Sequence, residues 1–94
     1  MLKFIAACGS GLGSSLMVSM NVSKVLKELG IEAEVEHSDI SNAVFKNADY
    51  YVLGRDVAES SAVSSIDKEK IIVLQSILSV DELRNKIKEK LNIQ

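Results

Sequence analysis

Short apolar runs alternate along the chain with stretches of helical spacing, and this alternation constrains the fold more than any other feature. The runs LKFIAA at 2–7, YYVLG at 50–54 and KIIVLQ at 70–75 are typical of strands. The last two are nearly continuous, as in strands covered on both faces. Residues 31–38 (IEAEVEHS) alternate between apolar residues and glutamates, which favours an edge strand with one face in water.

The segments between these runs carry the helical pattern. Within residues 14–29 the apolar side chains recur on one helical face, and Gly30 stands where a glycine commonly ends a helix. We expect two shorter helices at 40–47 and 57–66.

A last helix is expected after Ser79. This serine is a preferred N-cap residue, and Glu82 three positions later completes the pattern of a capping box. The basic cluster RNKIKEK at 84–90 also contains Glu89, and we interpret it as a solvated helix face rather than a nucleic-acid site. The expected buried stripe of this helix consists of Val80, Leu83, Ile87 and Leu91.

The order β-α-β-α-β-α-β-α predicts an α/β fold, a three-layer sandwich around a four-stranded parallel sheet with right-handed crossovers. The edge character of the second strand favours the strand order 2-1-3-4. Ligands of such sheets bind beyond the carboxyl ends of the strands, at the switch point between strands 1 and 3. A length of 94 residues suits a single domain, 1–94.

Composition and charge exclude several classes of protein. The formal net charge is −2, and the single cysteine cannot form an internal disulfide, so nothing indicates an oxidising compartment. The apolar stretch before Cys8 is too short for an export signal, and no run approaches the roughly 18–20 apolar residues of a membrane span. We therefore expect a cytoplasmic protein.

The sequence ACGSGLGSS at 7–15 falls at the expected switch point. Its glycines let the backbone approach a ligand closely, so that successive N–H groups converge on an anion. The helix that follows adds the positive end of its dipole, and the serine hydroxyls donate further hydrogen bonds. A turn alone requires fewer small residues, so we predict a P-loop-like phosphate loop made of Gly9, Ser10, Gly11, Leu12, Gly13, Ser14 and Ser15.

Cys8 stands directly before this loop. A helix N-terminus and oriented amides lower the pKa of a thiol from about 8.5 and favour the nucleophilic thiolate. The same amides would stabilise the charge of a transferred phosphoryl group. We therefore predict that Cys8 is a nucleophile, with a buried, inert cysteine as the alternative.

Familiar phosphate motifs do not fit the loop. A nucleotide-binding P-loop needs a lysine, which is absent between Lys3 and Lys24, and the glycine spacing differs from that of a dinucleotide fingerprint. The low-molecular-weight tyrosine phosphatase motif C-x5-R has Ser14 here in place of its arginine. The chain also has no proline for the Asp-Pro general acid of that family. A phosphocysteine formed here would be poorly hydrolysed, as suits a phosphoryl carrier.

The segment CGSGLGSS at 8–15 resembles the loop C-G-x-G-x-G-S-S of IIB components of the bacterial phosphoenolpyruvate:sugar phosphotransferase system (PTS), of the ascorbate type within the lactose/ascorbate superfamily. The segments ADYYVLGRDVA at 48–58 and LQSILSVDEL at 74–83 are similar to later parts of that family, so the resemblance spans the chain.

The resemblance implies a phosphotransferase, of the protein-phosphocysteine:sugar type. Cys8 would accept a phosphoryl group from a phosphohistidine of a IIA partner and donate it to a sugar or sugar acid carried by the membrane IIC permease. The resemblance implies no metal and no organic cofactor. It places the protein in the bacterial cytoplasm and, through IIC, transiently at the inner face of the membrane.

Further polar residues are candidates for accessory roles. His37 is expected on the same, buried face of its strand as Ile31, Ala33 and Val35, because successive side chains alternate. It would either assist a phosphate or be a packed structural residue. Arg55 should follow the third strand and either offset the charge of a phosphocysteine or lie exposed in a turn. Asp39 and Asp56 lie near the same rim, without the sequence context of a general acid.

Met17 and Met20 are expected one and two turns into the first long helix. They either form a soft apolar surface for docking IIA and IIC in turn, or occupy ordinary core or half-buried positions.

Two functions from other classes stay open. One is a phosphatase or reductase that uses Cys8, similar to the low-molecular-weight phosphatases. The other is a binding module whose loop captures an anion.

Overall fold

Four strands pair in parallel to form the sheet. The structure, a computed structural model, describes residues 2–8, 12–58, 61–76 and 79–92. The strand order is β2-β1-β3-β4, which confirms the predicted order 2-1-3-4. The strands are β1 (Leu2–Cys8), β2 (Ala33–Asp39), β3 (Tyr50–Gly54) and β4 (Ile71–Leu74).

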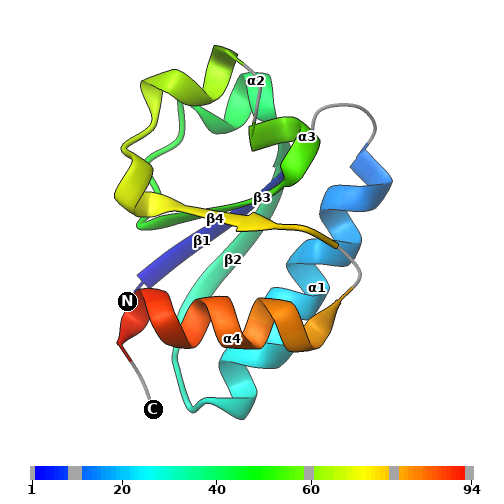
Figure 1. Cartoon of the computed structure of the whole chain (residues 1–94), viewed down its shortest axis with the longest axis vertical. Helices are drawn as coiled ribbons and strands as arrows, with labels where there is room; N and C mark the ends of the chain where they lie inside the picture. The colour runs from blue at the N-terminus through cyan, green and yellow to red at the C-terminus, as the bar shows by residue number, and fades with distance from the viewer. Residues whose placement is uncertain (1, 9–11, 59–60, 77–78, 93–94) are drawn as a thin grey trace.

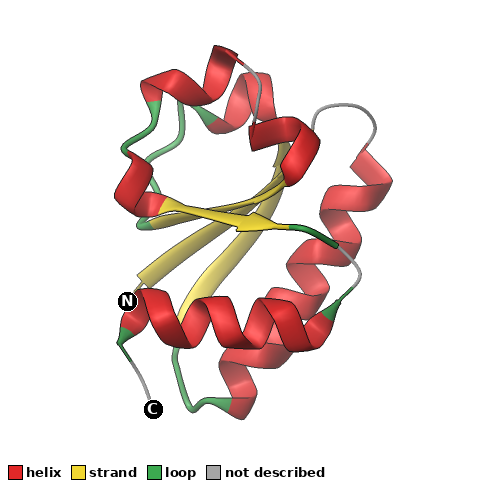
Figure 2. Cartoon of the chain, in the orientation of Figure 1, coloured by secondary structure: helices red, strands yellow, loops and turns green. Residues whose placement is uncertain are grey.

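Helices cover both faces of the sheet, so the expected three-layer α/β architecture is confirmed (Figure 1). The long helices α1 (Leu12–Glu28) and α4 (Val80–Leu91) lie on one face. The short helices α2 (Ile40–Ala43) and α3 (Arg55–Ala58) and the 3-10 helix η1 (Ser61–Ser65) lie on the other. A second 3-10 helix, Lys68–Lys70, leads into β4, and Figure 2 shows how strands and helices alternate.

Strand β1 contributes side chains to both hydrophobic cores. Phe4 and Ala6 pack in the cluster beneath α1 and α4, whereas Ile5 and Ala7 pack in the cluster beneath α2, α3 and η1. These side chains are at most 6% exposed. Because successive side chains of a strand point to opposite faces, this continuous apolar run fills both layers.

The two shorter helices are shorter than predicted. The segment expected at 40–47 is helical only over Ile40–Ala43 and continues as a turn, in which Phe45 N–H and Lys46 N–H donate to carbonyls three residues earlier. Such tighter bonds are common where a helix ends. The helix expected at 57–66 begins earlier, at Arg55, and is divided between α3 and η1.

The end of α1 explains where β2 begins. Gly30 adopts a left-handed conformation, with φ of 72°. Its N–H donates to Lys27 O at 3.1 Å and Ile31 N–H donates to Leu26 O at 2.8 Å, the two bonds of a Schellman motif. Because Ile31 closes the helix, the predicted strand 31–38 pairs only from Ala33 onwards.

We predict that Gly30→Ala lowers the free energy of unfolding by about 1–2 kcal/mol, because an L-side chain is strained at this φ. No atom lies within 4 Å of the added Cβ, so the loss comes from the backbone alone. Urea unfolding followed by circular dichroism measures it. Gly30→Asn should cost less than the alanine variant, and equal losses would contradict this explanation.

Candidate functional site

The carboxyl ends of the four strands lie along one edge of the sheet. Cys8 is the last residue of β1 and pairs in register with Asp39, the last residue of β2. On the other side of β1, Ala7 pairs with Leu53 of β3, so the chain beyond β3 begins next to Cys8. This edge, at the switch point between β1 and β3, is where open α/β sheets bind ligands.

Helix α1 begins at Leu12, two residues earlier than the sequence predicted. Gly13 is tolerated there because glycine is costly in the helix interior rather than in the first turn. The first turn therefore includes Gly13, Ser14 and Ser15, and N–H groups of a first turn have no intrahelical acceptors. Since α1 is 17 residues long, this end carries the positive pole of a substantial dipole.

Part of the predicted phosphate loop lies outside the described residues. This applies to Gly9, Ser10 and Gly11, and also to the side chains of Cys8, Leu12, Ser14 and Ser15. The described backbone thus places Cys8 at the end of a strand and Leu12 at the start of a helix, with three residues between them.

Asp39 lies opposite Cys8 and is half-buried. Its Oδ1 atom accepts a hydrogen bond from Asn42 Nδ2 at 2.6 Å, so the carboxylate is engaged by α2. This contact gives Asp39 a structural role at the rim. The side chain of Asp56 lies outside the described part of the chain.

The predicted burial of His37 is wrong. Val35, two residues earlier, packs partly against the core beneath α1, as the strand parity requires, but His37 is exposed. Because β2 is an edge strand, its apolar face is only half covered at Ala33 and Val35, and the cover ends before His37. His37 is therefore no packed core residue.

Arg55 directly follows β3, as expected. It is exposed, and it begins α3 rather than lying in a turn. Its guanidinium Nη1 donates to Gln75 Oε1 at 3.4 Å. Gln75 in turn directly follows β4, the strand beside β3. The contact thus joins the carboxyl ends of two neighbouring strands.

Glu82 fixes the backbone that follows β4. Its Oε2 atom accepts the N–H of Gln75 at 2.7 Å and its Oε1 atom accepts that of Ser76 at 2.9 Å. These two bonds, chiefly that from Gln75, hold the pKa of the Glu82 carboxyl below its ordinary value, and the Lys86 ammonium acts in the same direction. One carboxylate thereby orders the carboxyl end of an edge strand.

The predicted capping box is half correct. Ser79 Oγ accepts the N–H of Glu82 at 3.2 Å, as an N-cap should. The predicted reciprocal bond, from Ser79 N–H to the Glu82 carboxylate, does not form. Ser79 N–H donates to the Ser76 carbonyl, and the Glu82 carboxylate accepts from the backbone after β4. The sequence signal was the same for both arrangements, because only the fold brings Gln75 within reach of Glu82.

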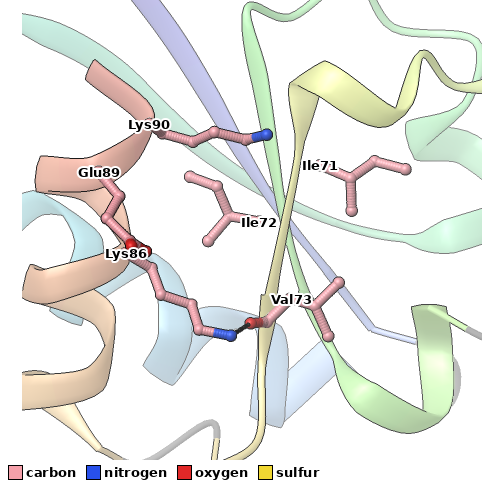
Figure 3. A pocket seen from close by; sticks show the side chains of 6 residues that line it. All are labelled: Ile71, Ile72, Val73, Lys86, Glu89 and Lys90. Atoms are coloured by element: carbon pink, nitrogen blue, oxygen red, sulfur yellow. Dashed lines mark hydrogen bonds between the residues drawn. The ribbon is translucent and has the colours of Figure 1, made fainter. Parts of the chain in front are cut away.

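Lys86 completes this group of contacts. Its Nζ atom lies 3.5 Å from Glu82 Oε2. The same atom donates to the Val73 carbonyl of β4, as Figure 3 shows. An edge strand leaves such carbonyls unpaired, and a lysine that covers one discourages pairing with another chain. The adjoining groove between β4 and α4 has a volume of about 340 Å³ and is lined by Ile71, Ile72, Val73, Lys86, Glu89 and Lys90.

An apolar surface lies on the first turns of α1. Leu16, Met17 and Met20 are 45%, 51% and 64% exposed. A core position is therefore wrong for Met17 and Met20, although Met17 is still about half-buried. Since α1 begins at the carboxyl edge of the sheet, this surface lies on the part of α1 nearest Cys8.

The described ranges contain no group of three or more His, Cys, Asp or Glu side chains that could hold a metal ion. Within the same ranges, each helix is too short or too polar to cross a membrane.

Comparison with known proteins agrees with the resemblance carried by the loop sequence. Residues 3–89 match the family model described as PTS system, Lactose/Cellobiose specific IIB subunit. A relative from Mycoplasma pneumoniae, the ascorbate-specific PTS system EIIB component, is 28% identical over 83 residues, which cover 88% of this chain and 87% of the relative.

Two solved structures from Bacillus subtilis have a similar fold. A low-molecular-weight protein tyrosine phosphatase superposes with a TM-score of 0.65 at 12% identity, covering 97% of each chain. The YwlE mutant superposes with a TM-score of 0.55, also at 12% identity, covering 98% of this chain and 93% of that one. At this identity the likeness concerns the fold alone.

We predict that Glu82→Gln lowers the free energy of unfolding by about 1 kcal/mol at neutral pH, because a carboxylate accepts these N–H groups more strongly than an amide. The pKa of Glu82 is depressed in the folded state, so its contribution is present above the unfolded pKa of about 4.3 and is lost as pH falls through the folded value. Urea unfolding from pH 3 to 7 measures this difference.

The matched control is Glu89→Gln, an exposed carboxylate two turns further along α4. This variant should change the free energy of unfolding little at any pH. A loss for Glu82→Gln that stayed constant down to pH 3 would contradict the charged contact.

Proposed function

Because this chain belongs to the lactose/cellobiose-specific IIB family of the PTS, whose members are phosphotransferases working with IIA and IIC components, we propose that Cys8 is its phosphoryl-carrying residue. The observation that carries the proposal is the position of Cys8. It ends β1 at the switch point of the sheet, and three residues separate it from the first residue of α1. A helix N-terminus favours the nucleophilic thiolate over the thiol. Its N–H groups can also bind the phosphoryl group that the thiolate receives.

The proposed reaction consists of two displacements at phosphorus. The Cys8 thiolate attacks the phosphohistidine of IIA, so that an S–P bond forms, the N–P bond breaks and the imidazole leaves. A substrate hydroxyl at IIC then attacks the same phosphorus, loses its proton and breaks the S–P bond, which restores the thiolate. The protein thus gains and loses one phosphoryl group in each cycle.

Backbone amides of residues 9–15 and the hydroxyls of Ser10, Ser14 and Ser15 would hold the phosphate in this account. The N–H groups of the first turn of α1, which have no acceptors within the helix, support that assignment. Arg55, one strand away from Cys8, would add a compensating positive charge. His37 is exposed on β2 and receives no role in the transfer.

The proposed substrate is a sugar acid of the ascorbate type, which rests on the name of the Mycoplasma pneumoniae relative. Transfer to a substrate on the IIC permease would place the protein at the cytoplasmic face of the bacterial membrane.

A cysteine phosphatase is the second candidate, because low-molecular-weight phosphatase structures share the fold. Those enzymes need an arginine six positions after the cysteine, where this chain has Ser14. Turnover of a phosphomonoester, rather than a stable phosphoprotein, would favour this candidate.

We predict one added phosphoryl group when the protein is incubated with phosphoenolpyruvate, the two general PTS proteins and an ascorbate-type IIA. Intact mass spectrometry measures the product. Cys8→Ser should abolish the label because a hydroxyl is a far weaker nucleophile than a thiolate, while His37→Gln should retain it. Failure of the wild type with a panel of phosphorylated IIA proteins would overturn the carrier function.

We also predict that the α1 surface formed by Leu16, Met17 and Met20 binds the partners. Replacing Met17 and Met20 by serine should raise the KM for phosphorylated IIA about thirtyfold, since apolar contacts at an interface centre are each worth about 1 kcal/mol and two are lost. The initial rate of labelling at varied IIA concentration measures this.

Phe45→Ser is the matched control, because Phe45 is 88% exposed and lies just beyond α2, on the opposite side of the sheet from α1. An equal rise in KM for this control would contradict a specific surface on α1.

A further inference from the structure

Asp39 is the ionisable residue that the sheet pairs directly with Cys8, since the two are Cα partners at the ends of β2 and β1. It is also the N-cap residue of α2, but its side chain forms no capping hydrogen bond there. Aspartate is common at this position because its carboxylate accepts an N–H of the first helical turn. Capping therefore does not explain why a half-buried aspartate stands opposite the proposed phosphoryl acceptor.

The described contacts of Asp39 orient its carboxylate without neutralising it. Its Oδ1 atom accepts from the side-chain amide of Asn42 at 2.6 Å, and an amide carries no net charge. The ion pairs formed within the described ranges involve other carboxylates, those of Glu28, Glu36, Asp81 and Glu82. The negative charge of Asp39 is therefore available to act on a neighbouring group.

Other charged groups of this edge are less directly placed. Arg55 follows β3, and its hydrogen bond to Gln75 turns the guanidinium toward β4, on the side of β3 away from Cys8. His37 lies two positions before Asp39 on β2 and is exposed. The first turn of α1 contains no acidic residue, and the ion pair at the end of β4 is two strands away from β1. Among the described groups, Asp39 is thus the charge that the register of the sheet places closest to Cys8.

The backbone pairing limits how far apart the two groups can be. Neighbouring strands lie about 4.8 Å apart. The carboxyl carbon of an aspartate is two C–C bonds of about 1.5 Å from its Cα atom. The Asp39 carboxyl carbon therefore lies within about 8 Å of the Cys8 Cα atom, whichever way the side chain points. Charges at such a distance still interact at physiological ionic strength, where the screening length is also about 8 Å.

The charge of Asp39 opposes the binding of a phosphoryl group at Cys8. A phosphoryl group on a side chain carries about −1.5 to −2 charges at neutral pH, more than the single charge of a thiolate. A nearby carboxylate therefore destabilises the phosphocysteine more than the free thiolate. The N–H groups of the first turn of α1 act in the opposite direction, since they stabilise bound anions. A carrier needs both influences, because it must accept the phosphoryl group and then release it.

We propose that Asp39 raises the transfer potential of the phosphocysteine at Cys8, so that the phosphoryl group passes readily to the next acceptor. The inference rests on the proposed function of Cys8 as the phosphoryl acceptor. No bond to Asp39 forms or breaks, and the two displacements at phosphorus are unchanged. Asp39 acts through its charge, and Asn42 orients it.

The equilibrium of phosphoryl exchange with IIA tests this proposal. Phosphorylated IIA and the unlabelled protein are mixed without IIC, and the labelled fraction of each is read by intact mass spectrometry. Asp39→Asn keeps the size of the side chain and an oxygen that can accept from Asn42, but removes the charge. It should shift the equilibrium about threefold toward the phosphorylated protein. The shift should disappear in about 1 M salt, where the screening length falls to about 3 Å.

Two matched variants separate charge from structure. Asn42→Ala removes the hydrogen bond of the Asp39 carboxylate but leaves its charge, and it should keep the wild-type equilibrium. Glu34→Gln removes a charge from an exposed position of the same strand, about 16 Å from Asp39 along β2. It should also leave the equilibrium unchanged, because the distance exceeds the screening length.

Alkylation of Cys8 gives a readout that needs no partner protein. Cys8 is the only cysteine of the chain, so the reaction with iodoacetamide reports on this thiol. The thiolate is the reactive form, and a nearby negative charge disfavours it. The pH at which alkylation reaches half its maximal rate should therefore fall by about 0.5 unit in Asp39→Asn and stay constant in Glu34→Gln.

The outcomes separate this inference from the carrier function. A labelled wild type with a threefold, salt-sensitive shift in Asp39→Asn supports the role of the charge. A labelled wild type with no shift, with a shift that persists in about 1 M salt or also occurs in Asn42→Ala, or with an unmoved alkylation midpoint overturns that role and leaves the carrier function intact. A wild type that phosphorylated IIA does not label overturns the carrier function, and this inference with it.

Discussion

The pairing of β1 with both of its neighbours is the interaction on which the rest of the structure depends. Strand β1 lies between β2 and β3 and sends Phe4 into one core and Ile5 into the other, both fully buried. A shift of one residue in its register would exchange the side chains of the two cores. The same register places Cys8 at the carboxyl edge, so the position of the proposed nucleophile is a consequence of core packing.

The second constraint acts at that edge, where strand ends and helix starts leave unpaired backbone groups. Helix α1 leaves the N–H groups of its first turn without intrahelical acceptors beside Cys8. At the end of β4 the corresponding N–H groups are bound by Glu82. The edge thus contains one region where N–H groups are available to an anion and one where a carboxylate of the protein already binds them. This contrast explains why we place the phosphate at α1 rather than at the end of β4.

The fold was largely predictable from the sequence because its periodicities are strong. The continuous run at 50–54 and the alternating glutamates of 31–38 identify a buried and an edge strand, and the edge strand favours the strand order that the structure has. Local patterns were less informative at the ends of elements. The start of α1 lies inside a glycine-rich segment, and the exposure of His37 depends on how far the helices extend over an edge strand.

The candidate site was predictable only in part. The loop at 8–15 carries its own chemical signal, whereas the contacts of Gln75 and Glu82 do not. A glutamate at the third position of a helix after a serine predicts a capping box in any fold. Its actual partners follow β4 and come within reach only through the tertiary structure. Long-range polar contacts of this kind leave no periodic pattern in the sequence.

The ³¹P NMR spectrum of the protein after labelling by phosphorylated IIA tests directly whether Cys8 carries the phosphoryl group. Phosphorus bonded to sulfur, to nitrogen and to oxygen gives separate resonances, so the spectrum identifies the acceptor atom. We expect one resonance of the S–P type, from Cys8, that disappears when IIC and its substrate are added. A resonance of the N–P type, from His37, or of the O–P type, from the serines of the loop, would contradict it.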